Sequence, residues 1–135
     1  MSDSQTRVTA DQLSTFIARA FESVGVSGSD AKTVAKIMTE IDLLGGSGHG
    51  VFRLPQYIRR IKAGGMNVTP DIQLEHETNS TAVVNGDNCI GHLAVKRATD
   101  VAIEKAEKMG VAWAGVKMGT HAGTASVYAR MALPH

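Results

Sequence analysis

The sequence contains few of the residues that mark specialised protein classes. It has one cysteine, Cys89, so no disulfide can form within the chain, and aromatic residues make up only 4%. No apolar run approaches the ~20 residues of a membrane span, and the N-terminus lacks the basic-then-apolar order of a secretory signal. Lys+Arg 14 and Asp+Glu 13 nearly balance and are interspersed, so no basic surface is evident. We therefore expect a cytoplasmic protein with neither nucleic acid nor membrane as partner.

The remaining composition is that of a folded protein. The chain has 135 residues, is 43% hydrophobic and has a mean hydropathy of -0.05. This length suits one domain with a substantial core. Cys89 stands beside Ile90, so we expect it to be a small buried hydrophobe rather than a reactive thiol.

The hydrophobic pattern predicts an α/β (mixed α+β) fold that begins with helices. Thr9 and Gln12 fit a capping box, and Ser29 is a plausible N-cap for the second helix. Residues 85–88 are turn formers, and a hairpin is the simplest way to join the strands on either side of residues 75–80. The expected elements are helices over 10–24, 30–44 and 55–63, strands over 72–74 and 81–84, a helix over 92–109, a buried strand over 111–116 and a helix over 127–133.

Two glycine-flanked histidines precede predicted helices. His49 can exchange a proton near neutral pH, and Arg53, four residues later, offers a fixed charged fork for a carboxylate. The pair indicates a site for a small carboxylate whose neighbouring carbon gains or loses a proton and a hydride. His121 lies in a second loop, between Gly119 and Gly123, where a strand leads into a helix whose N-terminus suits an anion.

Three segments together resemble the malate/L-lactate dehydrogenase family of the second type, which differs in fold from the Rossmann-type enzymes. The first is His-Gly-Val-Phe-Arg-Leu-Pro-Gln-Tyr at 49–57, and the second is Gly-Asp-Asn-Cys-Ile-Gly at 86–91. The third is Thr-His-Ala-Gly at 120–123, followed by Tyr-Ala-Arg-Met-Ala at 128–132. Their order and spacing match the family along essentially the whole chain.

The resemblance implies an NAD(P)-dependent oxidoreductase that interconverts a small 2-hydroxy acid, malate-like or lactate-like, and its 2-oxo acid. By matching position, His121 would be the acid/base, His49 its partner in the site and Arg53 the carboxylate clamp. The cofactor, NAD or NADP, would be contacted by residues of both loops and of the following helix. The residues expected there are His49, Gly123, Thr124 and Tyr128.

The sequence departs from the family pattern at three places and is much shorter. Gly48 stands where Ser is usual, Met118-Gly119 replaces an Asn-Ser pair, and Thr120 stands where Asn is common. Family enzymes continue far beyond the helix that contains Tyr128. We therefore expect a truncated form, with a helical segment over 1–66 and a partial α/β cofactor and substrate domain over 67–135. Without the rest of the sheet, apolar surface on the strand at 111–116 should be exposed.

Alternatives remain open at the level of the protein and of single residues. The chain could be a non-catalytic remnant or dimerisation module of such an enzyme, forming a homodimer or associating with a missing C-terminal half. Taken alone, His49 and His121 would be ordinary loop histidines, and Tyr128 could pack between helices rather than touch a cofactor. His76, His92 and His135 lack partners at metal-ligand spacing, so no metal site is expected.

Overall fold

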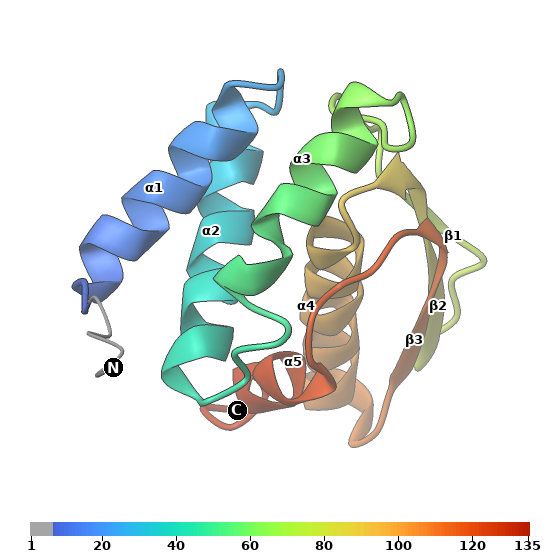
Figure 1. Ribbon diagram of the computed structural model, residues 1–135. Helices are drawn as coiled ribbons and strands as arrows, with labels where there is room; N and C mark the ends of the chain where they lie inside the picture. The colour runs from blue at the N-terminus through green and yellow to red at the C-terminus, as the bar shows by residue number, and fades with distance from the viewer. Residues whose placement is uncertain (1–6) are drawn as a thin grey trace.

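The computed structural model describes residues 7–135 and has the expected mixed α/β fold. Figure 1 shows the N-terminal helices on one side of α4 and a three-stranded sheet on the other. This arrangement confirms the prediction of helices followed by a small sheet and further helices. In chain order the elements are α1 (Ala10–Glu22), α2 (Gly28–Leu43), the 3-10 helix η1 (Val51–Arg53), α3 (Leu54–Lys62), β1 (Gln73–Glu75), β2 (Thr81–Cys89), α4 (Gly91–Met109), β3 (Trp113–Gly119) and α5 (Ala125–Met131).

Short polar side chains cap the first two helices. The capping box is confirmed, because Thr9 Oγ1 accepts from the Gln12 N–H at 3.2 Å and Gln12 Oε1 accepts from the Thr9 N–H at 2.9 Å. The prediction that Ser29 caps α2 is wrong. Ser27 is the cap, since its Oγ lies 3.2 Å from the Asp30 N–H.

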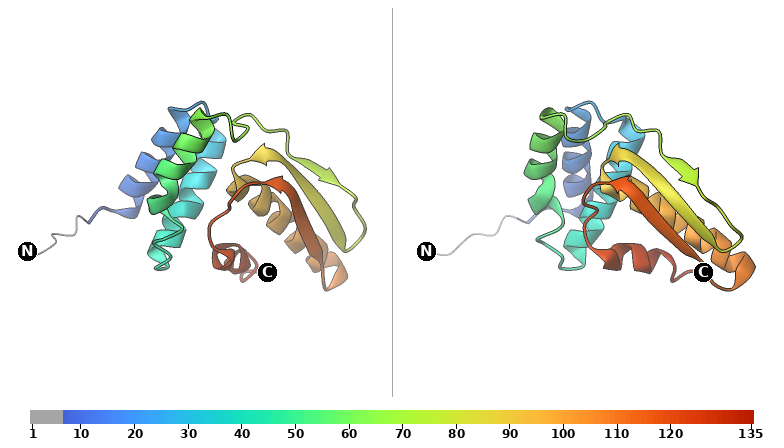
Figure 2. Two further views of the ribbon diagram at one scale, coloured as in Figure 1. Left: turned by 45° about the vertical axis from the view of Figure 1, so that its right-hand side comes forward. Right: turned by 90° about the vertical axis from the view of Figure 1, so that its right-hand side faces the viewer.

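The sheet has the order β1-β2-β3, with the first pair antiparallel and the second parallel. The predicted hairpin between β1 and β2 is therefore confirmed, and α4 supplies the crossover that a parallel pair needs (Figure 2). The predicted turn at 85–88 is wrong, because β2 continues to Cys89 through an irregularity in its pairing with β3. Asp87 and Asn88 still adopt positive φ, at 49° and 55°, so the turn-forming residues bend the strand without ending it.

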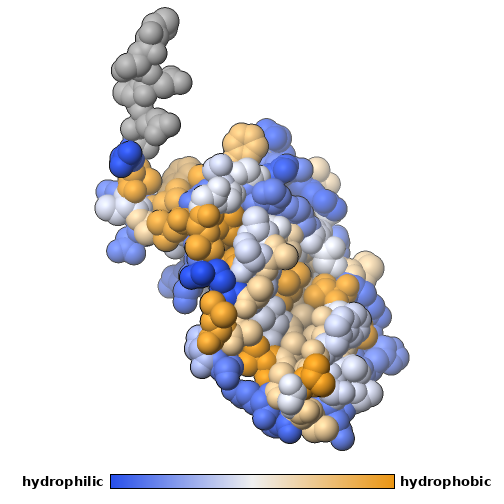
Figure 3. Space-filling model, turned by 90° about the horizontal axis from the view of Figure 1, so that it is seen from below, coloured by the Kyte–Doolittle hydropathy of each residue, from blue (hydrophilic) through white to orange (hydrophobic). Residues whose placement is uncertain are grey.

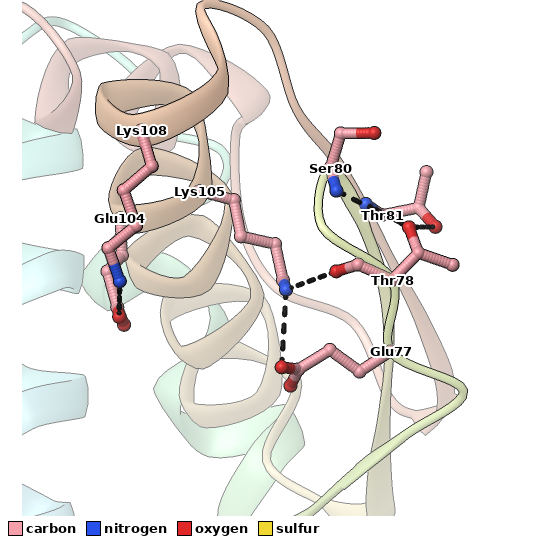
Figure 4. Close-up of polar contacts among 7 residues, drawn as sticks. All are labelled: Glu77, Thr78, Ser80, Thr81, Glu104, Lys105 and Lys108. Atoms are coloured by element: carbon pink, nitrogen blue, oxygen red, sulfur yellow. Dashed lines mark hydrogen bonds and ion pairs between the residues drawn. The ribbon is translucent and has the colours of Figure 1, made fainter.

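A lysine of α4 fastens the connection between β1 and β2. Figure 4 shows Lys105 Nζ, which donates to the Thr78 carbonyl oxygen at 2.6 Å and pairs with Glu77 at 3.4 Å. The Lys105 side chain is only 12% exposed, whereas the nearby Lys108–Glu104 pair lies at the surface. The tip of the hairpin is thus held against the C-terminal half of α4.

The main core lies between the N-terminal helices and the start of α4. It contains residues from both the 1–66 and the 67–135 segments, among them Ile17, Phe21 and Met38 together with Cys89 and Ile90. Cys89 is fully buried, as expected, and burial raises the pKa of its thiol. The end of β2 and the N-terminus of α4 are therefore fixed against the helical half of the molecule.

The prediction that the strand at 111–116 is buried is wrong. β3 is an edge strand, and Trp113 and Val111 are 64% and 72% exposed. Beside it, an open apolar groove of about 380 Å³ runs between α4, β3 and α5 and includes Val95, Ala102 and Val116. The expectation of exposed apolar surface on this strand is confirmed, and further apolar patches occur on the face shown in Figure 3. Within residues 7–135, none of the helices has the length and apolar character of a membrane span.

Candidate active site

The loop that carries His49 is shaped by a carboxylate from α2. Asp42 Oδ2 accepts a hydrogen bond from the Val51 N–H at 2.7 Å and so caps η1. The Gly50 backbone passes directly over this carboxylate, and a Cβ at Gly50 would collide with it. A side chain at position 50 would displace the Asp42 carboxylate, so glycine after His49 permits the close approach by which Asp42 anchors the loop where it enters α3.

Arg53 is braced by the same loop and keeps part of its guanidinium free. Its Nε donates to the Gly48 carbonyl at 2.9 Å, and its Nη1 donates to Gln56 Oε1 at 2.9 Å. A guanidinium has five N–H donors, so three remain for another ligand. The half-buried side chain is thus held in one orientation and can still bind a carboxylate through two parallel hydrogen bonds.

The structure brings the two loop histidines together. The rings of His49 and His121 stack with centroids 5.7 Å apart and an interplanar angle of 23°. Partial desolvation lowers the pKa of His121, and the nearby charges of Arg53 and His49 lower it further. His121 is exposed, so a neutral imidazole that can exchange protons faces solvent beside a fixed guanidinium.

Tyr57 of α3 forms a short side-chain hydrogen bond with His121. Its hydroxyl lies 2.6 Å from His121 Nδ1, a hydrogen bond that joins residues 64 positions apart. Tyr57 is 3% exposed, and desolvation raises its pKa to about 12, although the positive charge of Arg53 acts to lower it. The hydroxyl therefore stays protonated throughout the neutral pH range.

Thr120 fixes the second loop to the N-terminus of α4. Its Oγ1 accepts from the Gly91 N–H at 3.1 Å and donates to the Cys89 carbonyl at 2.9 Å. A Cβ at Gly91 would collide with the Thr120 carbonyl oxygen, so the helix can approach this closely only with glycine there. The threonine that departs from the family pattern therefore still ties down the loop beside His121.

A third histidine, His92, lies behind the site with no exposed surface. Neither ring nitrogen has a hydrogen-bond partner among the described residues. Burial lowers the pKa of His92 to about 3, with a smaller contribution from His121. Its ring meets that of Tyr57 edge-on, with the ring centroids 5.6 Å apart and an interplanar angle of 70°. His92 therefore acts here as a neutral packing group.

The other predicted site residues lie along the same loop and helix. Gly123 has a φ of 80°, its N–H points to His121 Nδ1 at 3.4 Å, and a side chain there would press on Ile41 and His92. Thr124 is the half-buried N-cap residue of α5, and its hydroxyl accepts from the Ser126 hydroxyl at 3.2 Å. Tyr128 is buried at 7% exposure and its hydroxyl donates to the Ala122 carbonyl at 2.6 Å.

The site also contains residues to which the sequence assigned no role. Tyr57 belongs to the first motif and follows Arg53 by four residues, so both side chains lie on one helical face. This spacing could have identified Tyr57 as a site residue from the sequence. His92 and Asp42 gave no such signal, because their importance depends on contacts between distant segments. Among residues 7–135, no group of three or more potential metal ligands lies together.

Comparison with known proteins identifies the family of the chain. The model of the malate/L-lactate dehydrogenase family matches residues 8–135. The malate/(S)-sulfolactate dehydrogenase of Methanothermus fervidus is 33% identical over 126 residues, which are 93% of this chain and 37% of that protein. The NAD(+)-dependent ureidoglycolate dehydrogenase of Escherichia coli is 30% identical over 126 residues, 93% of this chain and 36% of the relative.

A solved structure shows the same fold over the same part. The malate dehydrogenase of Pyrococcus horikoshii superimposes with a TM-score of 0.91 at 37% identity, covering 96% of this chain and 37% of that one. The chain therefore spans little more than a third of the length of the relatives it matches.

Proposed function

Because this chain belongs to the malate/L-lactate dehydrogenase family, we propose that it forms the acid/base and carboxylate-binding part of an NAD(P)-dependent 2-hydroxyacid dehydrogenase. The reaction interconverts a small malate-like or lactate-like 2-hydroxy acid and its 2-oxo acid. The observation that carries the proposal is the convergence of His49, Arg53 and Tyr57, all from the segment 49–57, with the distant His121.

His121 has the properties that the proton transfer requires. Reduction of a 2-oxo acid turns the carbonyl oxygen into an alkoxide, which must take up one proton to give the hydroxy acid. His121 is exposed, so its ring can reach a bound substrate, and its lowered pKa keeps the base form available near neutral pH for the reverse reaction. The stacked ring of His49 would orient His121 and limit the approach of water.

Arg53 would bind the substrate carboxylate. Its contacts with Gly48 and Gln56 fix the plane of the guanidinium before substrate arrives, so little side-chain freedom is lost on binding. A carboxylate held there would place the adjacent carbonyl near the imidazoles, since Arg53 is close enough to affect the pKa of both His121 and Tyr57. The proposed arrangement suits any small 2-oxo acid and does not select a particular one.

The cofactor proposed is NAD or NADP, which would supply or accept the hydride at the carbon beside the carboxylate. The residues present fit the reacting end of such a cofactor, because the ring of His49 stacks on that of His121 and the Gly123 N–H points to His121 Nδ1, with Thr124 as the next residue of the same loop. Tyr128 would support the loop rather than bind the cofactor through its hydroxyl, because that hydroxyl already donates a hydrogen bond to the Ala122 carbonyl oxygen.

A second candidate function is that of a non-catalytic interaction module of such an enzyme. The chain would then form a homodimer, or it would bind a polypeptide that corresponds to the part of the relatives that this chain does not match. Two observations favour it. The chain spans about 37% of those relatives, and one edge of β3 pairs with no strand among residues 7–135 and lies beside the apolar groove of α4 and α5. Unpaired strand edges and apolar grooves are typical sites of chain association.

The experiment that separates the two candidates is a titration of the purified chain with NADH and NADPH, with the oligomeric state measured in the same sample. Saturable binding, followed by turnover of 2-oxo acids, would support the dehydrogenase. A folded chain that binds neither cofactor would support the interaction module.

If turnover is found, two variants test the assigned roles. His121→Ala should abolish it, and Arg53→Ala should raise KM by about 10- to 150-fold, the equivalent of losing a charged hydrogen bond. Arg59→Ala is a matched control, because Arg59 is an exposed cation of the same helix region. Equal KM values for the two arginine variants would contradict the role of Arg53.

A further inference from the structure

We propose that Tyr57 is a positioning residue that sets the tautomer of His121, donating its hydroxyl proton to Nδ1 so that the neutral imidazole carries its proton on Nε2. The importance of this tautomer for catalysis rests on the function proposed above. The tautomer itself is a property of the chain and is measurable without any turnover.

The donors around Nδ1 support this direction. The Tyr57 hydroxyl is 2.6 Å away and the Gly123 N–H is 3.4 Å away. A backbone N–H can only donate, so it favours an Nδ1 without a proton. With Nδ1 accepting from both groups, the single proton of the neutral ring must be on Nε2.

The surroundings of Tyr57 keep its hydroxyl in place. The ring centroid of Phe21 of α1 lies 6.1 Å from that of Tyr57, and the ring of His92 of α4 meets Tyr57 edge-on with a centroid distance of 5.6 Å. Tyr57 is therefore held by three helices, counting its own α3, and its hydroxyl reaches the 120–123 loop from a rigid base. A buried hydroxyl needs a partner, and His121 Nδ1 is the partner it has.

The charged and titratable groups that face His121 are compatible with a neutral ring that carries its proton on Nε2. His49 approaches from the first loop, Arg53 from η1, and His92 from α4. None of these three groups is an anion, so none of them favours a second proton on the ring. His121 would accordingly present Nε2–H as a hydrogen-bond donor to a carbonyl oxygen. Once the ring is charged, it can give the Nε2 proton to the alkoxide. The remaining proton is then on Nδ1, where the Tyr57 hydroxyl turns to accept from it, so that Nε2 is free to take up the substrate proton in the reverse reaction.

The test is the 15N spectrum of the histidine side chains of the whole chain at a pH where His121 is neutral. Wild type should show one protonated nitrogen, Nε2, and one unprotonated nitrogen, Nδ1. Tyr57→Phe should move the two resonances of His121 towards each other, because the ring then exchanges between tautomers. Tyr128→Phe is the matched control, since it removes a hydroxyl that holds the same loop through Ala122 but does not touch His121.

A proton on Nδ1 in the neutral wild type, or unchanged resonances in folded Tyr57→Phe, would overturn the proposal. If the chain turns over 2-oxo acids, Tyr57→Phe should also lower kcat by about 2- to 12-fold with KM unchanged, which is the loss of one ordinary hydrogen bond. The expected spectrum in a chain without any turnover would support the tautomer and contradict only the dehydrogenase function.

Discussion

The fully buried His92 should make the stability of the fold depend on pH. Its pKa is lowered to about 3 by burial, whereas an exposed histidine titrates near ~6.5. Between these values the unfolded chain binds the proton and the folded chain does not, so unfolding becomes easier as pH falls. The stabilising contribution is therefore present above about pH 6.5 and is lost progressively towards pH 3.

The size of the effect follows from the two pKa values. Between pH 7 and pH 5, His92 alone should reduce the free energy of unfolding by about 2 kcal/mol. That is a large share of the ~5–15 kcal/mol of a typical domain. Urea unfolding at the two pH values should show the loss as a lower midpoint, by about 0.7–2 M for ordinary urea slopes.

The variant His92→Leu isolates this contribution. It removes two buried nitrogens that have no partner within the described residues and keeps an apolar side chain, so the fold should remain near wild-type stability at pH 7. The difference between wild type and variant should then change by about 2 kcal/mol on going to pH 5. His76→Asn, at an exposed position with a φ of 48° that Asn tolerates, should keep the wild-type slope. The reasoning is refuted if His92→Leu loses as much stability between pH 7 and pH 5 as wild type does.

Three further predictions concern the elements around the site. Gly91→Ala should destabilise the fold by about 1–3 kcal/mol, because the new methyl group would collide with the Thr120 carbonyl oxygen. Gly48→Ala is the control, since a methyl group there meets nothing within 4 Å. Equal melting temperatures of the two variants would contradict the packing described. Lys105→Met should cost about 1 kcal/mol by releasing the Thr78 carbonyl, and Lys108→Met, at the surface, should leave urea unfolding unchanged. Trp113→Thr should leave stability within about 0.5 kcal/mol and reduce self-association in sedimentation, and an unchanged association would exclude the β3 edge as the contact surface.

The elements of this fold could be predicted from the sequence where local rules decide them. Hydrophobic spacing predicted the five helices to within a few residues, and the capping box at Thr9 was predicted correctly. Local rules failed where neighbours decide the outcome. The turn-forming residues 85–88 bend β2 instead of ending it, because pairing with β3 resumes after them, where Cys89 lies opposite Gly119.

Burial was harder to predict than secondary structure. The apolar run at 111–116 predicted a buried strand, but β3 lies at the edge of the sheet and exposes Trp113. A run of apolar residues shows that a strand suits a covered environment, yet only the arrangement of the other elements determines whether anything covers it.

By itself, the sequence determined the chemical groups of the site, the order of the helices and strands, and membership of the family. Histidine, arginine and glycine at fixed spacing are local properties of a chain, and they persist however it folds. Only the tertiary structure decided that Tyr57 reaches His121, that Asp42 lies under Gly50 and that His92 is buried without a partner. These contacts join segments up to 64 residues apart, so they depend on how α3, α4 and the two loops pack together, which residue spacing does not encode.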